Sequence, residues 1–134
     1  MLQKAKALLE DGGYTCVLIG KDVVFTSKER GIGPLLSILN ADMGTQNAYV
    51  ADKVVGKAAA FLYTLMGIKA LYASTLSVPA LQVLQSVGIA VEYGLLTQSI
   101  RNRTNTGQCP MEQAVWEVTD AQTARRILEE KVQG

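Results

Sequence analysis

An alternation of helix and strand patterns, which begins after a pair of short strands, constrains the fold of this chain more than any other feature. Segments 14–19 and 23–26 are rich in β-branched and aromatic residues, and the Gly-Lys-Asp turn at 20–22 between them predicts an antiparallel hairpin. Helix and strand patterns then alternate over 51–66, 68–73, 79–87 and 89–93. Such short alternation implies parallel strands joined by right-handed crossovers. We therefore predict an α/β fold, a three-layer α/β/α sandwich whose mixed sheet has four or five strands.

The longest predicted helix runs from Ala51 to Met66. Its apolar residues recur at helical spacing, and Gly67 follows in the position that a left-handed cap prefers. Shorter helices are predicted over 2–9, 35–39, 110–117 and 120–132, with one or two helical turns over 95–100 and polar loops over 40–47 and 102–107. Thr119 and Gln122 form a capping-box pattern at the start of the last helix.

Composition and charge exclude several classes of function. The chain has 134 residues, 49% of them hydrophobic, which suits a single domain over 1–134 with one core. Thirteen Lys and Arg against twelve Asp and Glu give a net charge of +1 without a basic block, so nucleic acid and membrane surfaces are not expected partners. No apolar stretch reaches the ~18 residues of a spanning helix, and the N-terminus lacks a signal-peptide core. A cytoplasmic protein with two reduced cysteines, Cys16 and Cys109, is the expectation.

The chain contains no histidine. This absence removes the commonest zinc ligand, the commonest general base and the imidazole that activates Ser and Cys nucleophiles. Chemistry that depends on any of these groups is therefore not expected.

Four stretches resemble a small family of uncharacterised bacterial and archaeal proteins. They read FTSKERG at 25–31, VADKVVGKAAA at 50–60, NRT at 102–104 and CPME at 109–112. That family is regarded as a branch of the cytidine-deaminase-like fold that lacks the zinc ligands. The order of predicted elements is similar to that of such domains, so the resemblance implies the fold but no reaction.

Zinc deaminases hold their metal through H-x-E or C-x-E at one helix start and P-C-x-x-C at the next. At the second motif this chain has Pro79-Ala80-Leu81-Gln82-Val83, so Ala80 and Val83 would stand at the two cysteine positions. Neither side chain can coordinate a metal. The sequence therefore argues against a hydrolytic zinc deaminase, and we expect neither a metal nor a cofactor.

Positive charge marks the place of the missing zinc ligands. In the predicted helix, Lys53 and Lys57 lie four residues apart near the N-terminus, where cations oppose the helix dipole. Gly56 lies between them, and a mid-helix glycine costs about 1 kcal/mol relative to alanine. These choices favour an anion site formed by Asp52, Lys53, Gly56 and Lys57. The alternative is structural: Asp52 caps the helix, Gly56 allows tight packing, and the lysines are only solvated.

Further candidate residues lie elsewhere in the chain. Arg30 could bind a phosphate or carboxylate, or belong to a solvated turn, and Asn102 and Arg103 could contact a ligand or hold their loop. Cys109 precedes Pro110 at a helix start, where the dipole favours a thiolate, although most single cysteines are buried and inert. Glu112 could act as an acid or base, or cap the helix that Cys109 begins.

The predicted function is the binding of a small anionic or nucleotide-like ligand at the former active-site position. If the chain catalyses a reaction, a desolvated Lys53 or Lys57 would act as base or Schiff-base amine, with Asp52 or Glu112 assisting, or Cys109 would act as nucleophile. The alternative is a non-catalytic regulatory or assembly protein with a vestigial pocket, whose apolar helix faces form a homo-oligomer.

Overall fold

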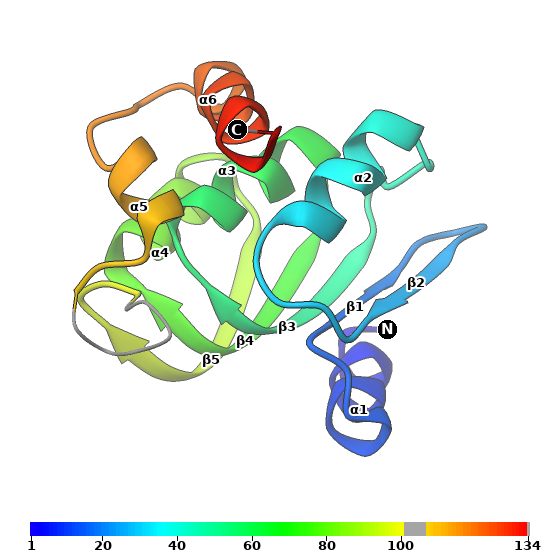
Figure 1. Cartoon of the computed structure of the whole chain (residues 1–134). Coiled ribbons are helices and arrows are strands. Elements are labelled where there is room, and N and C mark those ends of the chain that lie inside the picture. Colours follow the sequence, from blue (N-terminus) through cyan, green and yellow to red (C-terminus); the bar gives the residue numbers. More distant parts are fainter. Residues whose placement is uncertain (101–106, 134) are drawn as a thin grey trace.

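The computed structural model describes residues 1–100 and 107–133, and a five-stranded mixed sheet lies at its centre (Figure 1). The strands are β1 (Cys16–Ile19), β2 (Val24–Ser27), β3 (Tyr49–Val55), β4 (Ala70–Ser77) and β5 (Ala90–Thr97), in the spatial order β2-β1-β3-β4-β5. Strand β1 pairs antiparallel with β2 and β3, whereas β3, β4 and β5 are parallel. The predicted hairpin and the parallel βα units are thus confirmed.

Helices flank the sheet unequally. They are α1 (Leu2–Gly12), α2 (Gly33–Ala41), α3 (Lys57–Met66), α4 (Val78–Ser86), α5 (Pro110–Val115) and α6 (Ala121–Gln133). Helix α1 packs on one face, against β1 and β3, and the others gather on the opposite face around α3 (Figure 1). Within the described ranges, no helix has the length and hydropathy needed to span a membrane.

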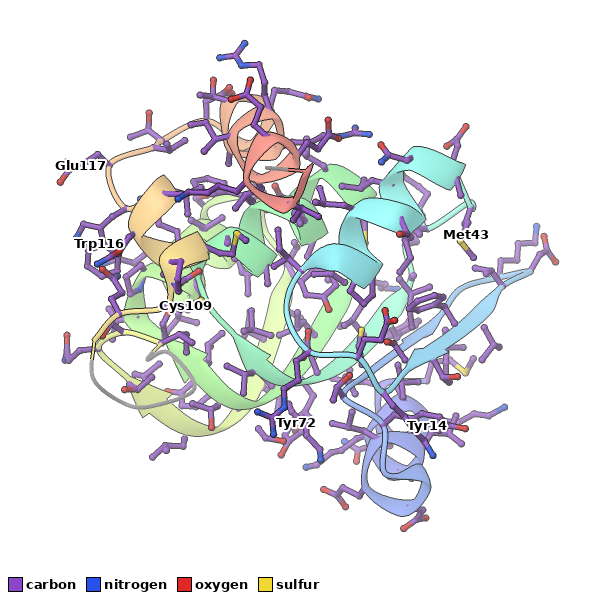
Figure 2. The ribbon with its side chains drawn as sticks, viewed as in Figure 1. Tyr14, Met43, Tyr72, Cys109, Trp116 and Glu117 are labelled. Carbon is purple, nitrogen blue, oxygen red and sulfur yellow. The ribbon has the colours of Figure 1, made fainter. Side chains whose placement is uncertain are left out.

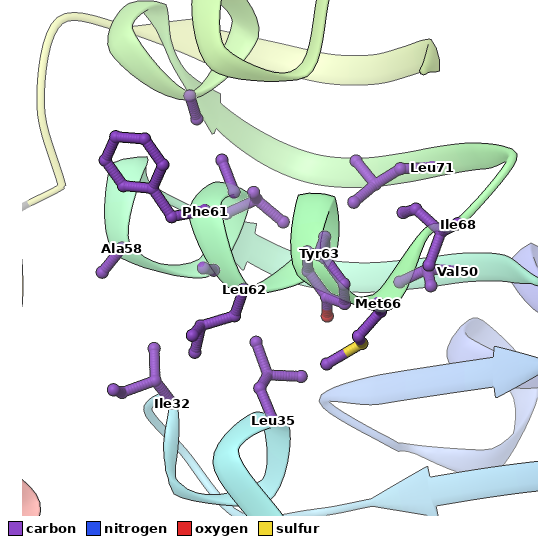
Figure 3. Close-up of a cluster of buried hydrophobic side chains, with 14 of the residues drawn as sticks. Ile32, Leu35, Val50, Ala58, Phe61, Leu62, Tyr63, Met66, Ile68 and Leu71 are labelled. Atoms are coloured by element: carbon purple, nitrogen blue, oxygen red, sulfur yellow. The ribbon is translucent and has the colours of Figure 1, made fainter. Parts of the chain in front are cut away.

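Helix α3 is the centre of the main hydrophobic core. All residues from Ala58 to Tyr63 are buried, because the sheet lies on one side of this helix and α2, α4, α5 and α6 surround the rest. Figure 3 shows Leu62 of α3 beside Ile32 and Leu35 of the α2 region. A smaller cluster lies under α1 and contains Ala5, Leu9, Val17, Ile19, Ala51 and Tyr72. The surroundings of α3 leave its first backbone N–H groups little access to water, so they need protein partners.

The prediction of one helix from Ala51 to Met66 was wrong. Its first part is strand β3, which ends at Val55, and the helix begins at Lys57. Strand β3 has β1 on one side and β4 on the other, and Val50, Ala51 and Asp52 are buried in succession, so its first half shows no alternation of buried and exposed positions. Its apolar residues therefore matched helical spacing by chance. As a result, Lys53 lies on a strand and Lys57 on a helix, not on one face of a single helix.

Other element ends also differ from prediction: the strand predicted over 68–73, for example, is β4 and runs to Ser77. Residues 95–97, expected to form helical turns, extend β5 to Thr97. Helix α6 is capped by Asp120, whose Oδ2 accepts a hydrogen bond from the Thr123 N–H at 2.8 Å, and not by Thr119. The predicted loop over 102–107 lies mostly outside the described residues.

Ser77 is the N-cap residue of α4, and its substitution tests how this helix is capped. The buried Ser77 Oγ accepts a hydrogen bond from the Ala80 N–H at 3.1 Å. Ser77→Ala should lower the free energy of unfolding by about 1 kcal/mol, because it leaves this donor unpaired. Ser86→Ala is the matched control, since Ser86 is exposed at the other end of α4 and its hydroxyl donates to the Val83 carbonyl. Equal losses in urea titrations of both variants would contradict the capping role.

Candidate functional site

The carboxyl ends of β3 and β4 lie at one edge of the sheet, and α3 and α4 begin there. In α/β proteins this edge is the usual place for ligands. Gly56 is the N-cap of α3 and Lys57 is its first residue. The anion site that was proposed from the sequence therefore includes the start of a helix, although this helix begins later than predicted.

A carboxylate from the same chain already occupies this helix start. Glu112 Oε1 accepts a hydrogen bond from the Lys57 N–H at 2.6 Å, and Oε2 accepts one from the Ala58 N–H at 2.8 Å. Glu112 lies in α5 and is only 3% exposed. Its carboxylate thus satisfies two donors that α3 cannot satisfy itself, and its charge complements the helix dipole. The interpretation of Glu112 as a cap of its own helix was wrong, because it caps α3.

Gly56 makes room for this carboxylate. A Cβ atom at position 56 would lie 2.7 Å from Glu112 Oε2 and closer still to the other atoms of the carboxylate. The Gly56 backbone has a φ of −102°, which any residue adopts, so the site requires empty space and not an unusual backbone conformation. The glycine that the sequence marked as locally unfavourable therefore allows a close approach, here by a side chain of the protein.

Lys57 of α3 also contacts the C-terminal end of α5. Its Nζ donates a hydrogen bond to the Trp116 carbonyl at 2.7 Å and lies 5.6 Å from the centre of the Phe61 ring. We call Gly56, Lys57, Ala58, Glu112 and Trp116 the α3–α5 junction. Burial raises the pKa of Glu112, while the hydrogen bonds from Ala58 and Lys57 and the charge of Lys57 act to lower it.

Asp52 belongs to a second polar cluster inside the protein. It is buried on β3, where the Tyr63 hydroxyl donates to Oδ2 at 2.6 Å and the Val54 N–H donates to Oδ1 at 3.3 Å. The Tyr63 hydroxyl also lies 3.3 Å from Cys16 Sγ. Burial raises the pKa of Asp52 to about 6, against the lowering effect of its hydrogen bonds. One interpretation of the sequence made Asp52 the cap of helix α3. That interpretation is wrong, because the Asp52 carboxyl accepts its hydrogen bonds from Tyr63 and Val54.

Burial also raises the pKa of the two neighbours of Asp52. The negative charge of Asp52 adds to this effect on the Cys16 thiol and on the Tyr63 hydroxyl. The Cys16 thiol, which is buried in the core, therefore stays protonated.

The other candidate residues lie on separate elements. Lys53 is exposed on β3, and Arg30 is exposed between β2 and α2. Cys109 is half-buried at the start of α5, with Trp116 at the other end of this helix (Figure 2). Asn102 and Arg103 lie outside the described residues. Across 1–100 and 107–133, no three His, Cys, Asp or Glu side chains are placed to hold a metal ion.

Sequence reasoning missed Tyr63 and Trp116. Tyr63 had a detectable signal, because a tyrosine inside an apolar helix needs a partner for its hydroxyl. Trp116 contributes a backbone carbonyl, for which no signal in the sequence exists.

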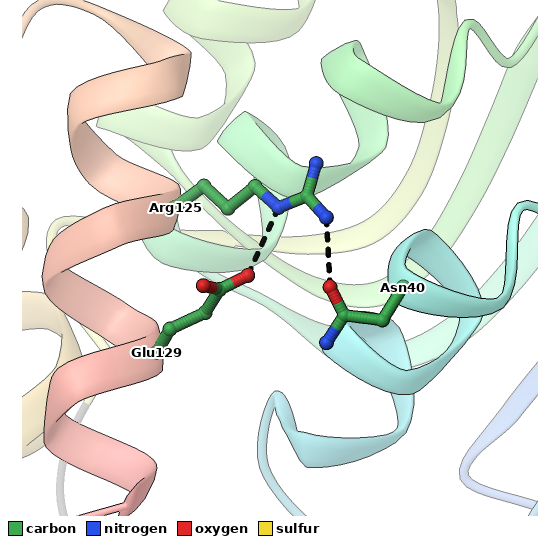
Figure 4. A network of polar contacts seen from close by, with 3 residues as sticks. All are labelled: Asn40, Arg125 and Glu129. Atoms are coloured by element: carbon green, nitrogen blue, oxygen red, sulfur yellow. Dashed lines mark hydrogen bonds and ion pairs between the residues drawn. The ribbon is translucent and has the colours of Figure 1, made fainter.

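Two hollows of the described surface lie away from the junction. One, of about 580 Å³, lies between α2 and α6, where Arg125 donates to Glu129 at 3.0 Å and to Asn40 at 2.8 Å (Figure 4). The other, of about 280 Å³, lies near Gly20 and Asn47. Neither hollow is lined by a candidate residue of the sequence.

The sheet and its helix starts define an α/β domain in which an internal carboxylate occupies the edge where ligands usually bind. The chain belongs to the TM1506 family, a domain of unknown function (DUF1893), whose model matches residues 4–132. A crystal structure of a DUF1893 family protein (TM1506) from Thermotoga maritima is similar, with 26% identity and a TM-score of 0.90 over 97% of this chain and 88% of that one. No curated protein matches the chain.

Proposed function

We propose that this chain is a ligand-binding domain of the cytidine-deaminase-like kind without zinc ligands, which binds a small anionic or nucleotide-like ligand at the start of α3. The contact between the Glu112 carboxylate and the amides of Lys57 and Ala58 carries this proposal. It supports a site with the geometry and polarity for a carboxylate or a phosphate oxygen. The hairpin followed by two parallel βα units supports the kind of fold.

The ligand would take the place of Glu112. This residue belongs to α5, a helix of six residues, and a short helix is held by its contacts more than by its own hydrogen bonds. When Glu112 leaves, the amides of Lys57 and Ala58 become donors for the ligand. If Trp116 moves with it, the Lys57 ammonium becomes a further donor. Because Glu112 competes, the apparent affinity is the intrinsic affinity multiplied by the fraction of molecules in which the site is open.

Glu112→Ala tests the site directly, because it removes the internal competitor. Acetate and inorganic phosphate should raise the melting temperature of this variant more than that of the wild type. Glu117→Ala is the matched control: it removes an exposed glutamate just beyond α5 and should respond to anions like the wild type. If neither anion stabilises Glu112→Ala more than Glu117→Ala, the start of α3 accepts no external anion and the proposal is wrong.

A screen of nucleotides, sugar phosphates and small carboxylates on the wild type identifies the ligand class. A compound at 100 times its dissociation constant adds about 2.7 kcal/mol to the free energy of unfolding, which a melting curve resolves. A compound that binds as proposed should stabilise Lys57→Met less than the wild type. An equal effect on both proteins would assign its binding to another place.

A further inference from the structure

The two edge strands of the sheet differ in the features that prevent pairing with a strand of another molecule. Strand β2, at one edge, has four residues, and charged residues flank it in the sequence at 21–22 and 28–30. Strand β5, at the other edge, has eight residues and contains neither lysine nor proline. Its one charged residue, Glu92, is paired with Lys6 of α1 at 3.2 Å. Short length, charged side chains and proline are the features that keep natural edge strands from pairing, and of these β5 has only Glu92, whose charge is paired.

The outer side of β5 presents a regular row of backbone groups. The Ala90 N–H donates to the Lys69 carbonyl beside β4, so Ala90 faces β4. Backbone groups alternate in direction along a strand. The residues that face outward are therefore Val91, Tyr93, Leu95 and Thr97. Among the described residues, β4 is the strand that pairs with β5, and it lies on the inner side.

The side chains of this edge are apolar and exposed. Leu95 is 61% exposed, Tyr93 is 42% exposed and Leu96 is 38% exposed. Burial of such side chains against a partner is favourable, and pairing would also satisfy the outward N–H and C=O groups.

We propose that β5 pairs antiparallel with β5 of a second copy of this chain, so that the two sheets become continuous. The strand is complementary to itself when Gly94 faces Gly94 across the two-fold axis. Tyr93 then lies opposite Leu95 of the second copy, and Val91 lies opposite Thr97, so all four outward residues form hydrogen-bonded pairs. Symmetric contacts of this kind are the commonest in homo-oligomers.

Charge and size favour this register. Glu92 lies opposite Leu96 of the second copy, so no like charges meet, whereas a register centred on Glu92 would bring two carboxylates together. Gly94 lies at the axis, at a pair without hydrogen bonds, where the two Cα atoms approach to about 4.5 Å and side chains crowd most. A residue without a side chain suits that place.

Sedimentation of the wild type and of Leu95→Lys across a dilution series tests the pairing. The wild type should be a dimer at high concentration, and Leu95→Lys should remain a monomer with an unchanged circular dichroism spectrum. Val24→Lys is the matched control, because Val24 is 64% exposed on the opposite edge strand, and this variant should dimerise like the wild type. A monomeric wild type, or a dimer that survives Leu95→Lys, would overturn the proposal.

Disulfide crosslinking tests the register. In a Cys109→Ser background, Glu92→Cys combined with Leu96→Cys should form a covalent dimer on oxidation, because the two positions face each other across the axis. Either cysteine alone should give no crosslink, since its counterpart in the second copy lies four residues away along the strand. Absence of the crosslink in a dimeric double variant would exclude the pairing centred on Gly94.

Discussion

Glu112→Ala is expected to lower the free energy of unfolding by about 3 kcal/mol, because each unpaired buried donor costs about 1 to 3 kcal/mol. The variant leaves the N–H groups of Lys57 and Ala58 without the carboxylate that bonds them at 2.6 and 2.8 Å. Water that enters the space would recover part of this loss, and the burial that raises the pKa of Glu112 offsets another part. Urea titration monitored by circular dichroism measures the change.

Gly56→Ala gives a second measure of the same contact. The added methyl group collides with the Glu112 carboxylate and should cost about 2 to 3 kcal/mol, within the range for overpacked sites. In the Glu112→Ala background the collision is absent, so the second substitution should cost little. The double variant is therefore expected to lose much less stability than the sum of the single variants. Additive losses would show that the glycine serves another purpose.

Two control variants distinguish the loss of the Glu112 carboxylate from a general change in the packing of α5. Glu112→Gln keeps the volume and one acceptor oxygen but turns an NH₂ group toward the other amide, so its loss should lie between those of the wild type and Glu112→Ala. Glu117→Ala should change stability by less than about 0.5 kcal/mol, because Glu117 is exposed. A loss in Glu117→Ala as large as that in Glu112→Ala would point to a general weakening of the α5 region.

The fold could be predicted from the sequence wherever local pattern decides it. The hairpin and the strand after Gly67 were recognised because turn residues bound short apolar runs. Strand β3 was missed because it is central, and its buried first half lacks the alternation of a strand that is exposed on one face. The sequence alone holds no local feature that marks Tyr49–Val55 as the partner of two other strands.

Only those residues of the candidate site that are adjacent in the sequence could be predicted. Gly56 and Lys57 were singled out because they are unfavourable where a helix was expected, and both belong to the α3–α5 junction. The occupant of this helix start could not be predicted, because Glu112 and Lys57 are separated by 55 positions. Lys53 was grouped with Lys57 by helical spacing, and this grouping failed with the helix that it assumed.

The stability of the protein is expected to fall as pH rises from about 4 to about 6, and Asp52 is the main cause. Its pKa is raised from 3.8 to about 6 in the folded protein, so the folded state keeps a proton that the unfolded state loses in this range. Stability is therefore highest below the unfolded pKa, decreases through this window and is level above it. A shift of about two units corresponds to about 3 kcal/mol. Urea titrations at a series of pH values measure the decrease.

Comparison with Asp52→Asn isolates this effect from other carboxyl groups, because their contributions are common to both proteins. These include Glu112, whose raised pKa acts in the same direction, and Asp120, whose lowered pKa acts in the opposite one. Relative to the wild type, Asp52→Asn should gain about 3 kcal/mol between pH 3.5 and pH 8. A difference between the two proteins that does not change with pH would contradict the raised pKa.

Tyr63→Phe tests which donor stabilises the ionised carboxylate of Asp52. The Tyr63 hydroxyl donates to Asp52 Oδ2 at 2.6 Å and thereby lowers the pKa of this carboxyl against the effect of burial. Without this donor the ionised carboxylate is harder to accommodate, so the decrease in stability should extend to higher pH than in the wild type. Asp52→Asn combined with Tyr63→Phe should show no such extension, because no carboxyl remains to titrate. If Tyr63→Phe leaves this pH window unchanged, the backbone amides of Val54 and Lys53 support the charge without the Tyr63 hydroxyl.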